Sequence, residues 1–296
     1  MLSDYPLMKN EPLSKYTAAR LGGAADFLYI ARESNEKLIE VVSAAWSENI
    51  PVRVLGGGAN VLVSDAGFRG LIVINRVGKA AFKDTSVTVT AGMSLTVLAR
   101  KCASQGLSGF EWAVSVPGTV GGAVVNNAGA HGGDMASCLR SAALVDAEKG
   151  TQMLTHDDLA YEYRSSALKR REDRRFLVTM ATLTLKPDTT EAINARMDEF
   201  IAHRKRTQPS GASLGSIFKN PPGDYAGRLI ELCGLKGSKI GGAQVSPVHA
   251  NFFINTQGAS ASASDYYRLI RLVQEIVHEK TGVLLETEVE VLGEGF

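Results

Sequence analysis

Two glycine-rich segments, about sixty residues apart, constrain this chain more than any other feature of its sequence. Residues 55–60 read LGGGAN, and residues 115–130 read SVPGTVGGAVVNNAGA. Glycine reaches positive φ without steric cost and leaves the backbone bare, so successive amide groups can contact phosphate oxygens. Either segment alone is explained as well by a structural turn or by tight packing of small residues. Two of them together predict a site for a dinucleotide-like ligand.

The spacing of these glycines argues against the two best-known phosphate loops. The GxxxxGK[ST] pattern that supports ATP hydrolysis is absent from the sequence. The GxGxxG pattern after a first strand is also absent, so the sequence does not favour a Rossmann fold.

Composition excludes several other classes of function. The 296 residues include 32 basic and 31 acidic side chains, so the net charge of +1 does not suggest binding to nucleic acid or to a membrane surface. Cys102, Cys138 and Cys233 form no CxxC pair, which indicates neither a disulfide framework nor a metal site. No signal peptide and no apolar run of the roughly 18 residues that a membrane helix needs is found. We therefore expect a cytoplasmic protein without membrane insertion and without a metal.

The order of expected elements predicts an α+β fold. Apolar side chains at helical spacing predict helices over residues 34–49, with Ser34 as N-cap, and over residues 264–280, which Gly282 ends. Further helices are expected over residues 94–105 and 190–207. Runs of β-branched residues predict strands at residues 52–55, 70–75, 86–90 and 283–292, with further strands between 142 and 185. These elements occur in clusters and form no regular βαβ ladder.

Five motifs in order carry a resemblance to a known family. They are residues 53–62, residues 117–123 with 126–130, residues 163–166 (YRSS), residues 215–221 (GSIFKNP), and residues 285–289 (LETEV) with Gly293. Together they resemble the UDP-N-acetylenolpyruvoylglucosamine reductases. About fifty residues separate Arg164 from Ser216, which is similar to the short form of the family that lacks an extra tyrosine-bearing loop.

The resemblance implies an architecture, a reaction and partners. It implies an FAD-binding domain of the vanillyl-alcohol-oxidase/PCMH type over residues 1–187, with subdomains of about 1–76 and 77–187, and a substrate-binding α+β domain over 188–296. NADPH would reduce bound FAD, and the flavin would pass a hydride to UDP-N-acetylenolpyruvoylglucosamine to give UDP-N-acetylmuramate. This is the UDP-N-acetylmuramate dehydrogenase step of peptidoglycan and cell-wall synthesis, and so of cell shape and division. The family expectation for the oligomeric state is a monomer.

The chemistry explains why three residue types would be needed. An enol ether accepts hydride only when its conjugated carboxylate is polarised, and a fixed arginine can do this. A hydroxyl beside the other carbon can then deliver a proton. The resemblance assigns these roles to Arg164 and Ser216, and it assigns Glu288 to organising the enolate. From the residues alone, Arg164 is equally an exposed arginine, Ser216 a turn residue, and Glu288 one of three carboxylates on a solvated strand face.

The resemblance also implies binding residues. Expected FAD contacts are Leu55, Gly56, Gly57, Gly58, Ala59, Asn60, Val61, Leu62, Ser115, Pro117, Gly118, Thr119, Gly121, Gly122, Ala123, Asn126, Gly129 and Ala130. Expected substrate contacts are Lys219, Asn220, His249 and Asn251. Arg204 begins a basic run at residues 204–206 that is a candidate for binding the UDP diphosphate, although such a run is more commonly a solvated helix end. Three features depart from the family pattern: the short link at residues 208–215, Pro247 where a charged residue is common, and Arg228 where tryptophan is common.

Two other functions remain open. An FAD oxidase of the same fold would reduce oxygen readily and would not need Arg164. A non-catalytic protein that binds FAD or a nucleotide sugar would not need Arg164, Ser216 and Glu288 together.

Overall fold

The computed structural model describes residues 1–256 and 261–296, and the chain forms two compact units. The first unit comprises Met1–Met8, Leu28–Gly57 and Gly70–Arg204, and the second comprises Lys9–Phe27, Gly58–Arg69 and Lys205–Phe296. The long C-terminal part of the second unit therefore begins after residue 204, whereas the expected domain boundary lay between residues 187 and 188. Two early segments also belong to the second unit. As domain assignments, the expected ranges remain a prediction. No helix in the described residues is long and apolar enough to cross a membrane.

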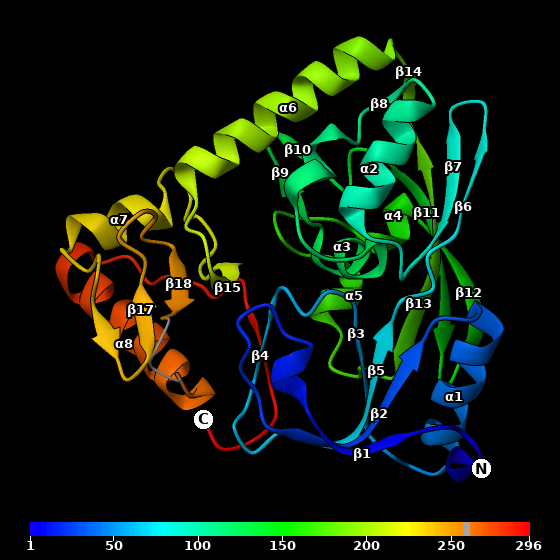
Figure 1. The fold of residues 1–296 in the computed structure, drawn as a ribbon, viewed down its shortest axis with the longest axis horizontal. Coiled ribbons are helices and arrows are strands. Elements are labelled where there is room, and N and C mark those ends of the chain that lie inside the picture. The colour runs from blue at the N-terminus through cyan, green and yellow to red at the C-terminus, as the bar shows by residue number, and fades with distance from the viewer. Residues whose placement is uncertain (257–260) are drawn as a thin grey trace. The chain divides into compact units, whose positions relative to one another are not determined.

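The first unit is built around a five-stranded sheet in the order β12-β11-β13-β7-β6, antiparallel throughout (Figure 1). Helices α2 and α3 bury apolar side chains in the same core cluster as β7, β11 and β13, and α3 contacts β13 and β7. The elements that lie wholly or mostly in this unit are α1 (Asn35–Ser47), β3 (Val52–Leu55), β5 (Phe68–Asn75), β6 (Ala80–Lys83), β7 (Ser86–Thr90), α2 (Leu95–Ser104), β8 (Leu107–Ser108), α3 (Val120–Asn126), β9 (Gly129–Ala130), β10 (Gly133–Asp134), β11 (Leu139–Asp146), β12 (Gly150–Thr155), α4 (His156–Leu159), α5 (Ala167–Arg170), β13 (Phe176–Thr184), β14 (Lys186–Pro187) and α6 (Thr190–Thr207).

Several local predictions are confirmed in this unit. Ser34 accepts the Lys37 N–H and caps α1, and the strands over residues 52–55 and 86–90 have the expected bounds. Strands β3 and β5 are parallel and belong to a four-stranded sheet in the order β1-β2-β5-β3, with β1 at Met8–Pro12 and β2 at Ala24–Ala31. The mixture of helices and antiparallel strands confirms the α+β class.

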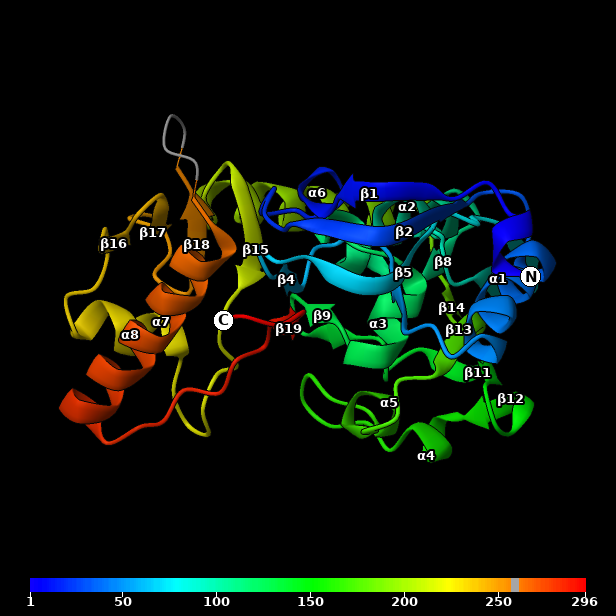
Figure 2. The same cartoon turned by 90° about the horizontal axis from the view of Figure 1, so that it is seen from below.

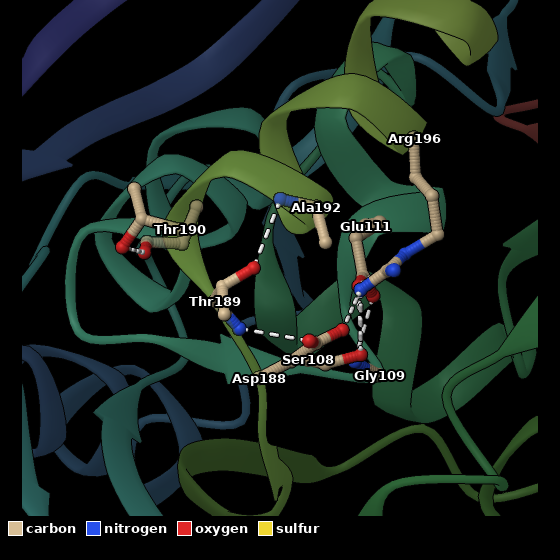
Figure 3. Close-up of polar contacts among 9 residues, drawn as sticks. Ser108, Gly109, Glu111, Asp188, Thr189, Thr190, Ala192 and Arg196 are labelled. Atoms are coloured by element: carbon tan, nitrogen blue, oxygen red, sulfur yellow. Dashed lines mark hydrogen bonds and ion pairs between the residues drawn. The ribbon is translucent and has the colours of Figure 1, made fainter.

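A buried carboxylate anchors helix α6 within the first unit (Figure 3). Glu111 is 7% exposed and accepts hydrogen bonds from Arg196, from the Ser108 hydroxyl and from the Gly109 N–H. Arg196 also pairs with Asp188 at 2.6 Å, just before α6 begins. Burial alone would raise the pKa of Glu111, but these hydrogen bonds outweigh it and hold the pKa below its ordinary value. The network thus fixes α6 to the segment that precedes the second glycine-rich turn.

The second unit has a four-stranded antiparallel sheet in the order β15-β18-β17-β16, against which helix α8 packs (Figures 1 and 2). Its elements are β4 (Val61–Val63), β15 (Ala212–Ser216), α7 (Ala226–Leu232), β16 (Lys239–Ile240), β17 (Ala243–Val245), β18 (Phe252–Asn255), α8 (Ala263–Thr281) and β19 (Glu290–Leu292). Leu269, Val273 and Val277 of the expected α8 stripe are fully buried, and Gly282 ends the helix in the left-handed conformation.

The expected strand over residues 283–292 is wrong in its extent, because regular pairing covers only Glu290–Leu292. These three residues pair in parallel with Val61–Val63 of β4. Before them, Leu285 and Val289 are buried four positions apart, while Val291 is 39% exposed. The alternation that placed Glu286, Glu288 and Glu290 on one face of a single strand therefore does not hold.

Candidate functional site

The two glycine-rich segments meet within the first unit. A Cβ atom on Gly56 would lie 2.0 Å from the Thr119 Oγ1, and a Cβ on Gly57 would lie 3.0 Å from the Gly118 Cα. Real Cβ atoms do not approach other atoms as closely as 2.0 Å, so Gly56 requires glycine, and a Cβ on Gly57 would force the Gly118 backbone to shift. The structure thus brings together the two segments that the sequence analysis linked to one dinucleotide-like ligand.

The second segment uses some of its small residues for packing and leaves others open. The Gly121 N–H donates to the Ala91 carbonyl at 2.8 Å, and a Cβ on Gly121 would lie 2.9 Å from the Ala91 Cβ. Gly122 is exposed, and the nearest atom to its added Cβ is 3.9 Å away. Tight packing therefore accounts for Gly121, whereas Gly122 presents bare backbone at the surface of α3.

Two buried polar atoms in this segment support the expectation of a bound cofactor. The Ser115 hydroxyl and the Asn126 Oδ1 are buried and have no hydrogen-bond partner among residues 1–256 and 261–296. Such atoms are costly unless a partner arrives, and a ligand with hydroxyl, amide or phosphate groups supplies one. Both residues are among those expected to contact FAD, so the residues present fit the group.

Arg164 is fixed against the same segment. Its guanidinium donates to the Gly129 carbonyl at 2.5 Å and to the Asn127 carbonyl at 3.4 Å. Arg164 has a φ of +55°, a left-handed conformation that costs a non-glycine residue of the order of 1 kcal/mol. Glu162 and Ser165 pair on either side of it, which holds the turn. A half-buried arginine is thus held at a set position beside α3 and is more constrained than an ordinary surface arginine.

The end of the first glycine-rich segment lies in the second unit, beside the glutamate motif. The Asn60 side chain donates to the Glu288 carbonyl at 3.2 Å, and the Asn60 carbonyl accepts the Glu290 N–H at 3.0 Å. Val61 and Leu62 then enter β4 and are buried. Residues 60–62 therefore contribute to the backbone frame around Glu288.

Ser216 lies next to Glu288 in the same unit. Ser216 ends strand β15, which is irregular between Ser213 and Ser216 and includes Gly215 at a φ of +78°. The following residue, Ile217, accepts the Glu288 N–H at 2.8 Å. Ser216 is thus the last residue of an irregular strand. The residue after it, Ile217, is hydrogen-bonded through its backbone to the segment that contains Glu288.

A pocket of about 490 Å³ opens beside Ser216. Four sequence-predicted residues line it: Ser216, Asn220, His249 and Asn251. The lining residues that the sequence analysis did not assign to the site are Tyr225, Gly227, Arg228, Glu231, Val248 and Ala250. Arg228 had one signal, as an expected departure from the family pattern. Val248 and Ala250 lie in residues 246–251, which resemble the family's substrate-domain segment, and no signal marked the other three.

His249 and Asn251 have defined positions in the pocket wall. Burial is the largest influence that lowers the pKa of His249, and Lys236 lowers it further, so the imidazole is neutral near pH 7. Its Nδ1 accepts the Asn251 N–H at 3.2 Å, which places the ring proton on Nε2. The Asn251 side chain accepts the Phe218 N–H at 3.0 Å and donates to the Phe218 carbonyl at 2.8 Å.

The two remaining expected substrate residues are placed elsewhere. Lys219 pairs with Glu286 at 2.5 Å, and its side chain is 16% exposed. Arg204 lies near the end of α6 in the first unit, where burial lowers the pKa of its guanidinium. Neither residue is among those that line the 490 Å³ pocket.

Comparisons with known proteins match both halves of the chain. Residues 28–155 match the family model described as an FAD binding domain. Residues 207–292 match the model described as the UDP-N-acetylenolpyruvoylglucosamine reductase C-terminal domain.

Curated and solved relatives extend the likeness over almost the whole chain. The chain is 39% identical to UDP-N-acetylenolpyruvoylglucosamine reductase 2 of Symbiobacterium thermophilum, covering 97% of this chain and 92% of that one. It is 45% identical to the reductase of Trichormus variabilis, covering 95% and 85%. The crystal structure of the Thermus caldophilus reductase superposes with a TM-score of 0.81 at 36% identity, over 97% and 99% of the two chains. The chain therefore belongs to the UDP-N-acetylenolpyruvoylglucosamine reductase family.

Proposed function

We propose that this protein reduces UDP-N-acetylenolpyruvoylglucosamine to UDP-N-acetylmuramate with NADPH, through bound FAD, in the peptidoglycan pathway. The names of the relatives and the matched FAD binding domain support the reaction and the cofactor. The proposal includes action in the cytoplasm as a monomer, as the family expectation has it.

The hydrogen bond from the Glu288 N–H to the Ile217 carbonyl carries this proposal. This bond supports the proposal because the segments that contain Ser216 and Glu288 are neighbours in one unit, beside a pocket that Ser216 lines. A protein that only bound a nucleotide sugar would have no need of a hydroxyl and a carboxylate in this arrangement.

We assign each of the three residues a role from its chemistry. FAD, when bound, supplies the hydride. Arg164 is permanently charged and held by two backbone carbonyls, so it suits polarisation of the substrate carboxylate. Ser216 delivers the proton to the other carbon, and Glu288 organises the enolate end of the substrate.

The expected binding residues form two groups, one for the cofactor and one for the substrate. The paired glycine segments, with Ser115 and Asn126, would hold FAD, and bare backbone at Gly118 and Gly122 allows close approach along a long ligand. Asn220 and His249 are candidate substrate contacts in the pocket, together with Lys219 and Arg204 outside its lining. The Asn220 Oδ1 accepts the Ala226 N–H at 3.1 Å, so its NH₂ group is the part that would donate to substrate.

A purified sample tests the proposal directly. We expect a flavin absorbance spectrum, and consumption of NADPH that continues only when the enolpyruvyl sugar is present. Rapid oxygen consumption without that sugar would favour an oxidase, and a colourless protein that cannot take up FAD would refute the proposal.

Ser216→Ala separates the two half-reactions. The variant should still allow NADPH to reduce the flavin but should lose nearly all turnover of the sugar, because the proton donor is absent. Stopped-flow flavin reduction and steady-state turnover measure the two steps. Turnover at the wild-type rate would show that another group supplies the proton.

A further inference from the structure

The two charged residues that line the pocket beside Ser216 are each paired with an oppositely charged residue that does not line it. Arg228 and Glu231 are its charged lining residues. Arg228 pairs with Asp224 through one edge of its guanidinium, formed by Nε and Nη2, with a distance of 2.7 Å from Nε to Oδ1. Glu231 pairs with Lys236 at 2.7 Å. With protein groups alone, the pocket is therefore close to electrically neutral.

A nucleoside diphosphate sugar brings about two negative charges into this pocket, if the proposed function holds. His249 does not offset them, because burial and Lys236 lower its pKa and leave it neutral near pH 7. Asn220 supplies an uncharged donor. Among the described lining residues, Arg228 is the cation.

The pairing of Arg228 with Asp224 is of a kind that a ligand can replace. The two residues are four positions apart, and their side chains are 58% and 23% exposed. Exposed ion pairs of this spacing contribute little, since water screens them and both side chains lose freedom. A guanidinium binds phosphate oxygens through the same two-pronged geometry that it uses here with a carboxylate.

Asp224 remains a permanent competitor for Arg228. The hydrogen bond from Arg228, and then that from the Tyr225 N–H, lower the pKa of Asp224 to about 2. Asp224 is thus ionised throughout the neutral range, and a ligand competes with it for the Nε/Nη2 edge of the guanidinium.

We propose that Arg228 binds the diphosphate of the nucleotide sugar and that Asp224 occupies Arg228 until the ligand arrives. The inference rests on the proposed function and assigns the diphosphate contact to a residue at which this chain departs from its family. Arg228 is a binding residue in this proposal and takes no part in proton or hydride transfer.

Two substitutions with opposite expected effects test the exchange. Arg228→Gln should weaken binding of UDP to the FAD-loaded protein by roughly 10- to 100-fold, since a hydrogen-bonded charge is lost. Binding of uridine, which has no phosphate, should not change. Asp224→Asn should tighten UDP binding several-fold, because the competing charge is removed while the Oδ1 that accepts the Tyr225 N–H is kept.

Arg268→Gln is the matched control. Arg268 is 65% exposed and pairs with Asp265 three positions before it, and it does not line the pocket. Calorimetric titration with UDP and uridine gives the affinities. Steady-state turnover should show a raised KM and a nearly unchanged kcat for Arg228→Gln, and neither change for the control.

The outcomes distinguish this inference from the proposed function. Equal UDP affinity in Arg228→Gln and wild type would overturn the inference, as would equal weakening by Arg228→Gln and Asp224→Asn, which a purely structural ion pair predicts. Loss of uridine binding in step with UDP would also overturn it, since the change would then reach the whole pocket. In all three cases, turnover of the enolpyruvyl sugar by the wild-type protein would leave the proposed function standing. If the wild-type protein did not turn over this sugar, the proposed function would be refuted.

Discussion

Asn251 connects the pocket wall to the backbone that carries Ser216, and its removal should affect both stability and turnover. Its side chain is bonded to both backbone groups of Phe218, and its own carbonyl accepts the Ile217 N–H at 2.9 Å. The Ile217 carbonyl in turn accepts the Glu288 N–H. Residues 217 and 218 are thus held from two sides, and Ser216 is the residue directly before them.

The cost of Asn251→Ala follows from burial. Asn251 is 3% exposed and Phe218 is 1% exposed, so the substitution leaves a buried N–H and a buried carbonyl without partners. Each such group costs about 1–3 kcal/mol, and water entering the space left by the side chain would recover part of this. We expect the free energy of unfolding to fall by about 2–4 kcal/mol.

Turnover should fall through misplacement of Ser216. A shift of about 1 Å at a reacting group lowers a rate by about 100-fold, so we expect a fall in kcat of roughly 10- to 100-fold. Reduction of the flavin by NADPH should be unaffected, because the contact between Gly57 and Gly118 lies in the first unit. Asn255→Ala is the matched control, since Asn255 makes longer side-chain hydrogen bonds of 3.2 and 3.4 Å four positions further on.

The choice of probe matters for this test. The two tryptophans, Trp46 and Trp112, belong to the first unit, so their fluorescence reports little on the second. Hydrogen exchange of the peptide that contains residues 216–218, with urea unfolding followed by circular dichroism, reports on the region in question. Wild-type protection and unfolding midpoint in Asn251→Ala would refute the energetic reasoning, and a normal kcat in a destabilised variant would refute the positioning role.

Two further predictions concern the first unit. Gly56→Ala should reduce the flavin content of the purified protein, because the new Cβ would lie 2.0 Å from the Thr119 side chain. Gly78→Ala is the control, since its new Cβ would have no neighbour closer than 3.7 Å. Full flavin absorbance in Gly56→Ala would contradict the packing argument. Arg196→Met should lower the free energy of unfolding by about 1–2 kcal/mol at pH 7, a figure reduced because Arg196 is 40% exposed. The folded-state pKa of Glu111 is below its unfolded value, so its stabilisation is present above the ordinary glutamate pKa and is lost as the pH falls through the folded value. The difference between wild type and Arg196→Met should therefore shrink in urea titrations at acid pH, and a constant difference would indicate that Glu111 is not the partner that matters.

Helices and strands were predicted correctly from the sequence where the spacing of apolar residues agreed with the residues that begin or end the element. Residues 86–90 have the expected bounds because β-branched residues alternate along the strand, and residues 190–207 form the expected helix. The strand expected over residues 283–292 is too long, because buried Leu285 and Val289 are held by tertiary packing in a segment without regular pairing. Alternation along a sequence cannot show whether a partner strand is present.

The candidate site was predictable only in part, for a related reason. Glycine content indicated the two segments, and the structure added that Gly57 touches Gly118. The assignments of Arg164, Ser216 and Glu288 came from resemblance, since each residue type has a commoner structural use. Tyr225 and Arg228 could not be assigned to the site from sequence, because the pocket exists only once α7 lies beside the segment that contains His249.

The pairing of Asn60 with Glu288 has a consequence for how the protein is made. The two residues are 228 positions apart, so the end of the first glycine-rich segment cannot reach its final environment until the glutamate segment has been synthesised. At roughly 5–20 residues per second, this delay on the ribosome is about 10–45 s. Strand β4 spends that time without β19, as an apolar segment with unpaired backbone that needs protection from other chains. Uptake of the cofactor should accordingly be a late event that follows synthesis of the glutamate segment.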